Sequence, residues 1–254
     1  MWIRDRADEV AAALMLLTRL PAWPVRAHAE DLVGRAVWAY PAVGALVGAI
    51  GGGVCLLAGW AGLPPFAGAL LGLAATVLAT GCFHEDGLAD FCDGVGGGRT
   101  RERKLEIMRD SRIGSYGAAA LVLSLGLRAS ALAAIADPVM VLCVWTASAA
   151  GGRGAALLLL GALRPARTDG LASAAATPPA LALAAGGLVS VAAALLALGA
   201  PGLALWAAAM GGGAVILALS RRHLGGYTGD ALGAAAQAGE TAALLTAAVL
   251  WGVP

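Results

Sequence analysis

Long apolar runs alternate with short polar stretches along the chain. A helix that crosses a bilayer needs about 20 mostly apolar residues. Seven segments of the 254-residue chain come close to that length, and proline or glycine divides neighbouring segments. The pattern predicts an all-α, polytopic integral membrane bundle of about seven transmembrane helices. The predicted helices cover roughly residues 36–61, 65–83, 115–135, 139–161, 180–200, 202–219 and 231–252. The run Gly151-Gly-Arg-Gly154 leaves the continuity of the fourth segment open.

Lysine and arginine lie almost entirely on one side of these segments. If all seven cross the membrane, one face holds fifteen of the seventeen basic residues, and only Arg128 and Arg153 lie inside segments. Basic residues accumulate on the cytoplasmic side. We therefore expect a protein of the bacterial cytoplasmic (inner) membrane whose active-site loops face the cytoplasm. The loops on this face are residues 1–35, 84–114, 162–179 and 220–230.

Residues 1–35 are expected to form a cytoplasmic or interfacial N-terminal segment. Ile3, Ala7, Val10, Leu14 and Leu17 recur at helical spacing among charged residues. A helix with this pattern can lie in the membrane interface. An ordinary helix packed against the loops is the alternative.

Composition supports the membrane assignment and limits the partners. Hydrophobic residues make up 59% of the chain and charged residues 13%, whereas soluble domains have about 25% charged residues. The net charge of +1 offers no basic excess for nucleic acid, and the four cysteines lack metal-binding spacing. We expect one membrane-embedded domain over residues 1–254, with the lipid bilayer as a partner. Gly44, Gly48 and Gly52 permit close helix contacts, including contacts between protomers of a homo-oligomer.

A dense acidic cluster follows the second apolar segment. Asp86, Asp90 and Asp93 are spaced i, i+4 and i+7, so they share one face if the helix continues. Carboxylates this close repel one another, and a bound cation would remove that cost. Hard oxygen ligands without a Cys or His pattern favour Mg²⁺ or Mn²⁺ over Zn²⁺. Mg²⁺ usually shares its coordination shell with water and substrate phosphates. A solvated acidic helix end is the alternative. His84, just before the cluster, could act as a general base or could orient a carboxylate.

Arginines and a glycine turn follow the acidic cluster. Arg109 and Arg112 flank Asp110 and precede Gly114 at the start of the third segment. Arginine binds phosphate through paired hydrogen bonds, and the N–H groups of a helix N-terminus bind anions. A metal–carboxylate cluster followed by such groups suits phosphoryl chemistry. Three other basic residues lie nearby, Arg101, Arg103 and Lys104. We interpret them at least partly as the basic residues that mark the cytoplasmic side of a membrane protein.

A third polar stretch, residues 225–233, lies on the same predicted face. Thr228, Gly229 and Asp230 within it could add a phosphate or metal contact. Glu240 follows inside the last segment, where an ionisable residue is a functional hypothesis by default. Its partner could be Arg128 or Arg153, in a pair with or without a functional role.

Three ordered motifs resemble those of the cobalamin synthase family, the adenosylcobinamide-GDP ribazoletransferases. They are HEDGLAD at 84–90 with Asp93-Gly94, KLEIMRDSRIGSYG at 104–117, and GYTGDALG at 226–233. Order and spacing fit over nearly the whole chain. Two departures are Glu85, where the family pattern has an apolar residue, and Phe91-Cys92, at positions that are usually small.

The resemblance implies the last assembly step of the cobalamin nucleotide loop. A ribose hydroxyl of α-ribazole, or of its 5′-phosphate, would attack the corrinoid-linked phosphate of adenosylcobinamide-GDP, and GMP would leave. Mg²⁺ is the implied cofactor. His84 and Asp110 compete for the role of catalytic base, with orientation of the arginines as the other role for Asp110. The implied metal ligands are Asp86, Asp90, Asp93 and Asp230, and the implied substrate-binding residues are Arg109, Arg112, Gly114, Thr228 and Gly229.

Two other functions fit part of the pattern. Asp90-x-x-Asp93-Gly94 matches the opening of the CDP-alcohol phosphotransferase signature, but Gly97-Gly98 stands where an Ala-Arg pair is expected. A transporter could use Glu240 and the buried arginines. Transporters place their binding groups near the midplane and often contain inverted repeats, whereas here most of the charge sits at one face and no repeat is visible.

Overall fold

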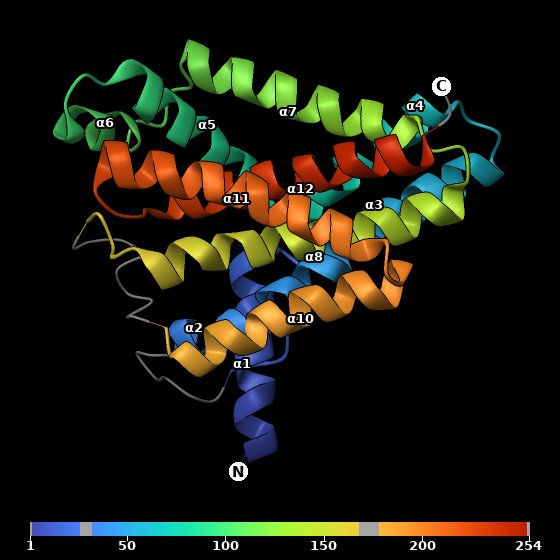
Figure 1. The fold of residues 1–254 in the computed structure, drawn as a ribbon, viewed down its shortest axis with the longest axis horizontal. Coiled ribbons are helices and arrows are strands. Elements are labelled where there is room, and N and C mark those ends of the chain that lie inside the picture. The colour runs from blue at the N-terminus through green and yellow to red at the C-terminus, as the bar shows by residue number, and fades with distance from the viewer. Residues whose placement is uncertain (1, 26–31, 168–177, 253–254) are drawn as a thin grey trace.

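The computed structural model describes residues 2–25, 32–167 and 178–252, which form helices and connecting turns with only isolated bridges in place of a sheet. Figure 1 shows most of the helices running side by side along the longest axis. The predicted all-α bundle is thereby confirmed. The elements in chain order are α1 (Trp2–Leu17), α2 (Leu32–Arg35), the 3₁₀ turn η1 (Ala36–Ala39), α3 (Tyr40–Trp60), α4 (Pro65–Thr80), α5 (Phe83–Gly97), α6 (Arg101–Ile107), α7 (Ser115–Ala133), α8 (Pro138–Ala162), α10 (Ala180–Leu198), α11 (Gly202–Leu224) and α12 (Gly229–Trp251).

Among the described helices, five crossings satisfy both the length and the apolar composition of a membrane span. They lie at Leu32–Trp60, Ser115–Ala133, Pro138–Ala162, Ala180–Leu198 and Gly202–Leu224. A sixth results if α4 and α5, which meet at a 90° bend, count as one broken span. The predicted count of seven is therefore not confirmed. The predicted second span was also too long, because α4 ends at Thr80 and the chain then turns through Gly81 and Cys82 in left-handed conformations.

The predicted seventh segment corresponds to α12, which has 23 residues and therefore the length of a span. It falls short of the apolar composition of the five candidate spans, since it carries Asp230, Gln237 and Glu240. These polar side chains are tolerated because α12 is packed among α5, α7, α8 and α11. Helix α12 is therefore a central element of the bundle, shielded by its neighbours on several sides.

Helix α8 is the other central element. In its most apolar stretch 78% of the residues are buried, compared with 17% in α10 on the outside of the bundle. The helix is continuous from Pro138 to Ala162, so the glycine-rich run at 151–154 does not interrupt it. The Asp137 side chain accepts a hydrogen bond from Val139 N at 2.9 Å, which caps the first turn.

The predicted glycine contacts form within the chain. A Cβ atom at Gly44 or Gly48 would collide with the backbone of α8, at Ala149 and Trp145 respectively. Because glycine has no side chain, α3 and α8 can pack with their backbones in contact at these positions. This glycine face is occupied by α8, so it does not provide a contact between protomers.

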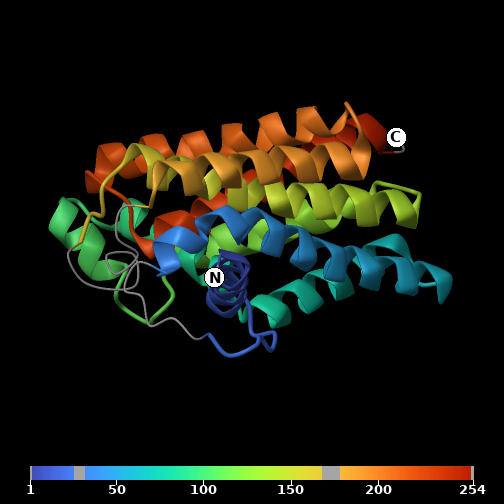
Figure 2. The ribbon, with the colours of Figure 1, turned by 90° about the horizontal axis from the view of Figure 1, so that it is seen from below.

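Helix α1 lies across the bundle, roughly perpendicular to its long axis, and is seen nearly end-on in Figure 2. The fully buried carboxylate of Glu9 fixes this arrangement. Glu9 accepts hydrogen bonds from Arg35 at 3.1 Å and from the Trp38 indole at 2.7 Å, and it pairs with Arg6 at 2.8 Å. The crossing orientation is the one expected of an interfacial helix, and the interfacial location stays a prediction.

Candidate active site

Helix α5 carries the acidic motif. It begins at Phe83, directly after the left-handed turn, and continues without a break through Gly87. Asp86 and Asp90 lie one turn apart and are exposed and half-buried, respectively. The motif is therefore helical, as the spacing required, but it belongs to a separate helix bent by 90° from α4.

A glycine crossing brings α12 against this helix. A Cβ atom at Gly87 would lie 3.1–3.2 Å from the backbone of Asp230 and from the Cα of Gly233, and a Cβ at Gly233 would lie 3.3 Å from the Cα of Gly87. At these distances a side chain at either position would push the two helices apart by a few tenths of an ångström. Because both positions are glycine, Asp230 on α12 is brought to the acidic face of α5.

The carboxylates of the two helices form one electrostatic group. Asp90 experiences the charges of Asp86, Asp230 and Asp93, and Arg167 is the cation that opposes them. Among the described residues, however, no three acidic, histidine or cysteine side chains are close enough to form a ready metal site. Hard oxygen donors with excess negative charge suit Mg²⁺, which commonly binds one or two carboxylates together with water and phosphate oxygens. The residues present fit the ion, and its binding stays a prediction.

Asp93 has a different environment from the other aspartates. It is buried, and its carboxylate accepts hydrogen bonds from Gly114 N at 2.7 Å and Gly117 N at 2.8 Å. These are free donors of the first turn of α7, where a negative charge is favourable. A Cβ atom at either glycine would collide with the carboxylate. The helix N-terminus predicted to bind phosphate through Gly114 is thus occupied by Asp93, which anchors α7 to α5.

The arginines of the motif at 104–117 lie on the exposed loop before α7. Arg112 donates to both carboxylate oxygens of Asp110, at 3.0 and 2.6 Å. This pairing lowers the pKa of Asp110 to about 2. A carboxylate with so low a pKa is a weak base, so the geometry favours the role of orienting Arg112 over that of taking a proton. Arg109 is also exposed on this loop.

Thr228 begins α12 and is buried. Its hydroxyl accepts a hydrogen bond from Ala231 N at 3.1 Å and interacts with the Asp230 carboxylate. The hydroxyl therefore caps the helix and holds Asp230, so direct contact with substrate is not its evident role. Gly229 is exposed, with open space where a Cβ would stand.

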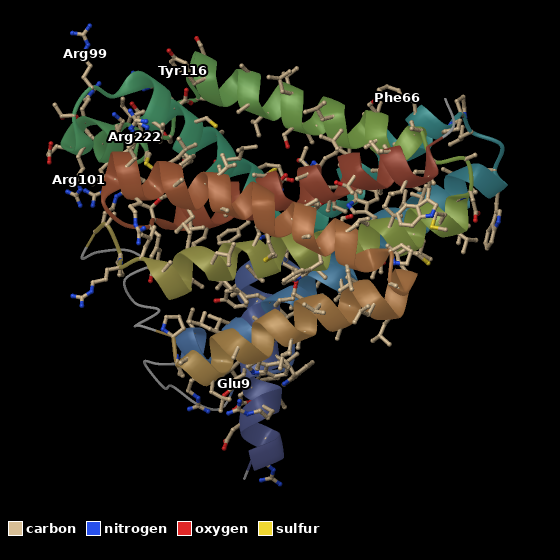
Figure 3. The ribbon with its side chains drawn as sticks, viewed as in Figure 1. Glu9, Phe66, Arg99, Arg101, Tyr116 and Arg222 are labelled. Carbon is tan, nitrogen blue, oxygen red and sulfur yellow. The ribbon has the colours of Figure 1, made fainter. Side chains whose placement is uncertain are left out.

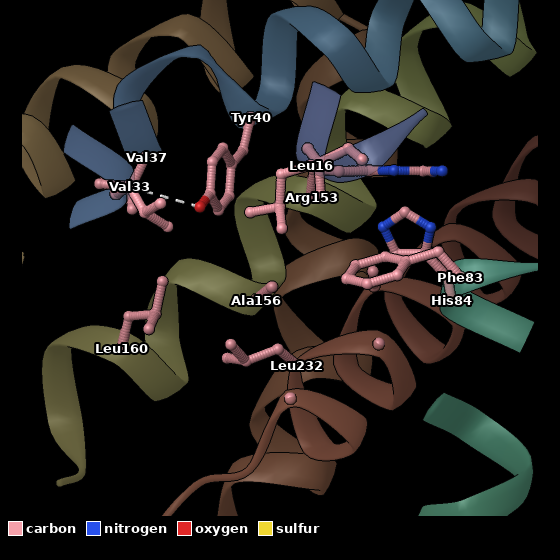
Figure 4. A pocket seen from close by; sticks show the side chains of 14 residues that line it. Leu16, Val33, Val37, Tyr40, Phe83, His84, Arg153, Ala156, Leu160 and Leu232 are labelled. Carbon is pink, nitrogen blue, oxygen red and sulfur yellow. Dashed lines mark hydrogen bonds between the residues drawn. The ribbon is translucent and has the colours of Figure 1, made fainter. Parts of the chain in front are cut away.

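His84 lies at the inner end of the acidic motif, 3% exposed, with its ring edge-on to Phe83. Its Nδ1 atom is buried without a hydrogen-bond partner among the described residues. The imidazole borders a cavity of about 80 Å³ between α1, α3, α5, α8 and α12. Figure 4 shows His84, Phe83 and Arg153 on one side of this cavity and Val33, Val37 and Leu160 on the other.

Four charged side chains are buried beneath the site. Arg128 donates to Glu85 at 3.2 Å and to Glu240 at 3.3 Å, and Arg153 also pairs with Glu240. The Trp145 indole and the Gln237 amide complete the group, at 3.0 Å to Glu240 and 2.9 Å to Glu85. Both predicted partners of Glu240 are confirmed. The two glutamates and two arginines balance in charge, which lets the group exist among apolar helices.

Sequence reasoning undervalued several basic residues. Arg101 donates to the carbonyls of Leu224 and Ala166, both at 2.7 Å, and so ties α6 to the end of α11. Lys104 is buried with its ammonium on the Gly98 carbonyl at 2.8 Å. Arg167 donates to the Leu105 carbonyl at 2.7 Å and also acts on the carboxylates. Their density in the sequence was the available signal, but it could not separate them from topology-determining charges.

The chemical groups gather at one end of the bundle. Figure 3 shows Arg99, Arg101 and Arg222 at this end, opposite Phe66. A membrane bundle with carboxylates and arginines at one end has the groups that an integral membrane transferase acting on a phosphate-containing substrate requires.

Comparison with known proteins gives the family. The family described as cobalamin-5-phosphate synthase matches residues 9–248. The chain is 47% identical to an adenosylcobinamide-GDP ribazoletransferase of Bradyrhizobium diazoefficiens, covering 97% of this chain and 95% of the relative. It is 46% identical to one of Mesorhizobium japonicum with the same coverage. No solved structure matches the chain. The chain belongs to the cobalamin-5-phosphate synthase family, whose members are transferases of cobalamin biosynthesis.

Proposed function

We propose that this membrane enzyme joins adenosylcobinamide-GDP to α-ribazole or its 5′-phosphate and releases GMP. The observation that carries the proposal is the Gly87–Gly233 crossing, which gathers Asp86, Asp90 and Asp230 from two helices. Family membership supports the same reaction. A CDP-alcohol phosphotransferase and a transporter are disfavoured because the family match covers nearly the whole chain.

In this reaction an oxygen–phosphorus bond replaces another. A ribose hydroxyl oxygen bonds to the corrinoid-linked phosphorus, the bridging bond to the second phosphate breaks, and GMP leaves with the electron pair. The hydroxyl proton goes to a base. His84 is the better of the two candidates because its Nδ1 is buried and has no hydrogen-bond partner among the described residues, whereas Asp110 is half-buried and bound to Arg112.

The carboxylates would hold Mg²⁺, which neutralises phosphate charge when bound. Asp86, Asp90 and Asp230 are the candidate ligands, of which one or two would hold the ion together with water and phosphate oxygens. Asp93 is assigned to the support of α7. Arg109 and Arg112 are exposed on the loop before α7 and would bind the diphosphate of the substrate. Arg167, which already counteracts the carboxylates, would limit their repulsion between turnovers.

The polar end is proposed to face the cytoplasm, since it carries most of the lysines and arginines. A cysteine accessibility assay in intact and opened cells tests this orientation. Cys82 is exposed near the start of α5 and can report the location of the site. A membrane-impermeant thiol reagent should label Cys82 only after the cells are opened. Labelling in intact cells would contradict the orientation.

The reaction is tested by following GMP release from purified protein supplied with adenosylcobinamide-GDP, α-ribazole and Mg²⁺. EDTA and Asp86→Ala should each abolish release. Release that survives Asp86→Ala but not EDTA would keep the reaction and move the metal toward Asp230. No GMP from well-folded protein would refute the proposed function.

A further inference from the structure

The apolar cavity beside His84 is large enough for part of a substrate. Its volume of about 80 Å³ is several times the roughly 10–15 Å³ that one water requires. Aromatic and aliphatic side chains form nearly all of its wall, chief among them Leu17, Val37, Tyr40, Phe83, Leu160 and Leu232. A flat apolar group would make favourable apolar contacts with this wall.

One wall of the cavity belongs to the start of α12. Gly229 and Gly233 line the cavity and lie on either side of Asp230 in the chain. A molecule bound in the cavity would therefore have one end close to the turn of α12 that carries Asp230.

The polar groups of the wall limit which molecule fits. Arg153 is already paired with Glu240, so a charged ligand would find no free counter-charge. A guanine base would lose several hydrogen bonds to water without replacement, which is costly. A lipid chain would leave His84 Nδ1 unsatisfied. An uncharged, largely apolar aromatic base that carries a sugar hydroxyl meets both requirements.

We propose that this cavity binds the aromatic base of the nucleoside substrate and directs its ribose hydroxyl to His84 Nδ1, next to the turn of α12 that carries Asp230. The inference rests on the proposed function for the identity of the nucleoside. It adds the binding site of the nucleophile and the reason for its selection over the guanosine portion of the other substrate.

A matched pair of substitutions on α8 tests the proposal. Leu160 lines the cavity, whereas Leu158 lies on the same helix, is half-buried and does not line it. Leu160→Phe should fill the cavity and weaken α-ribazole binding by roughly tenfold or more, the scale of small volume changes in an apolar pocket. Leu158→Phe should leave the binding unchanged. Equilibrium dialysis of α-ribazole against the intact protein in detergent measures binding without turnover, and KM values for both substrates follow in the GMP assay.

The expected result is a rise in Kd and KM for α-ribazole in Leu160→Phe alone, with the KM for adenosylcobinamide-GDP unchanged. Equal α-ribazole binding by both variants and the native protein would overturn the inference. Mass spectrometry that finds a lipid displaced by Leu160→Phe, with α-ribazole binding unaffected, would also overturn it and identify a lipid as the occupant. If α-ribazole binds as expected but no GMP forms, the proposed reaction fails and the binding site stands.

Discussion

Replacing Arg128 with methionine should destabilise the bundle more than replacing Arg128 and Glu85 together. Arg128 bridges the carboxylates of Glu85 and Glu240, and all three side chains are at most 10% exposed. Without Arg128, Glu240 retains Arg153, whereas the one remaining partner of Glu85 among the described residues is the Gln237 amide. The single substitution therefore strands one buried charge.

The cost can be estimated from this arrangement. Removing one partner of a buried ion pair costs about 3–5 kcal/mol, because the remaining charge is left desolvated and uncompensated. For a chain of this size, about 2–4 °C per kcal/mol converts this to a fall in melting temperature of roughly 6–20 °C. In the double variant Arg128→Met with Glu85→Leu, no charge is stranded. The remaining cost is that of an unpaired amide at Gln237, about 1–3 kcal/mol.

Thermal unfolding of the native protein, both single variants and the double variant in one detergent measures the coupling. We expect the double variant to be more stable than Arg128→Met, and Glu85→Leu alone to be destabilised because it leaves Arg128 with less counter-charge. If the double variant loses the sum of the two single losses, charge balance is not what holds these residues together. The argument from the buried network would then be refuted.

Three further predictions address the site. Gly87→Ala should lower the rate of GMP release severalfold, because it separates α5 from α12. The control is Gly126→Ala, where a Cβ atom meets open space; it should leave the rate unchanged and the stability unchanged or raised by up to about 1 kcal/mol. Equal rates in the two variants would contradict the role of the crossing. Asp93→Asn should destabilise the protein by about 1.5–3 kcal/mol, because its hydrogen bonds to α7 become weaker, and should leave the Mg²⁺ concentration for half-maximal activity unchanged. Asp86→Asn should raise that Mg²⁺ concentration. The reverse pattern would return Asp93 to the metal site. The pairing with Arg112 lowers the pKa of Asp110 to about 2, so the carboxylate stays ionised above about pH 3. Asp110→Asn should therefore not shift the pH profile of kcat between pH 5 and 9. Loss of the acidic limb would identify Asp110 as the base.

The helices were largely predictable because their cause is local. A bilayer requires apolar runs of a certain length, and Pro138 and Pro65 stand at the first turns of their helices as the breaks suggested. The turn at Gly81 and Cys82 was missed, because His84 and Glu85 look like the end of a span in sequence, whereas in the structure they are buried in a second helix.

The residues of the candidate site could also be picked out from the sequence, but the separate role of each residue could not. Asp86, Asp90 and Asp93 look alike as an i, i+4, i+7 set. Only the position of α7 shows that Asp93 is bound to two backbone N–H groups. Glu85 likewise departs from the family pattern in sequence and has a buried partner, Arg128, 43 positions further along the chain.

The sequence by itself determined the class of fold, the polar end of the bundle and the set of residues available for chemistry, because hydrophobicity and charge follow from composition along the chain. The tertiary structure decided which of those residues meet. The Gly87–Gly233 approach, the Asp93 anchor, the four-charge network and the cavity at His84 all join helices that are distant in sequence. Such contacts depend on how closely two helices can pack, and periodicity within one helix carries no information about its neighbour.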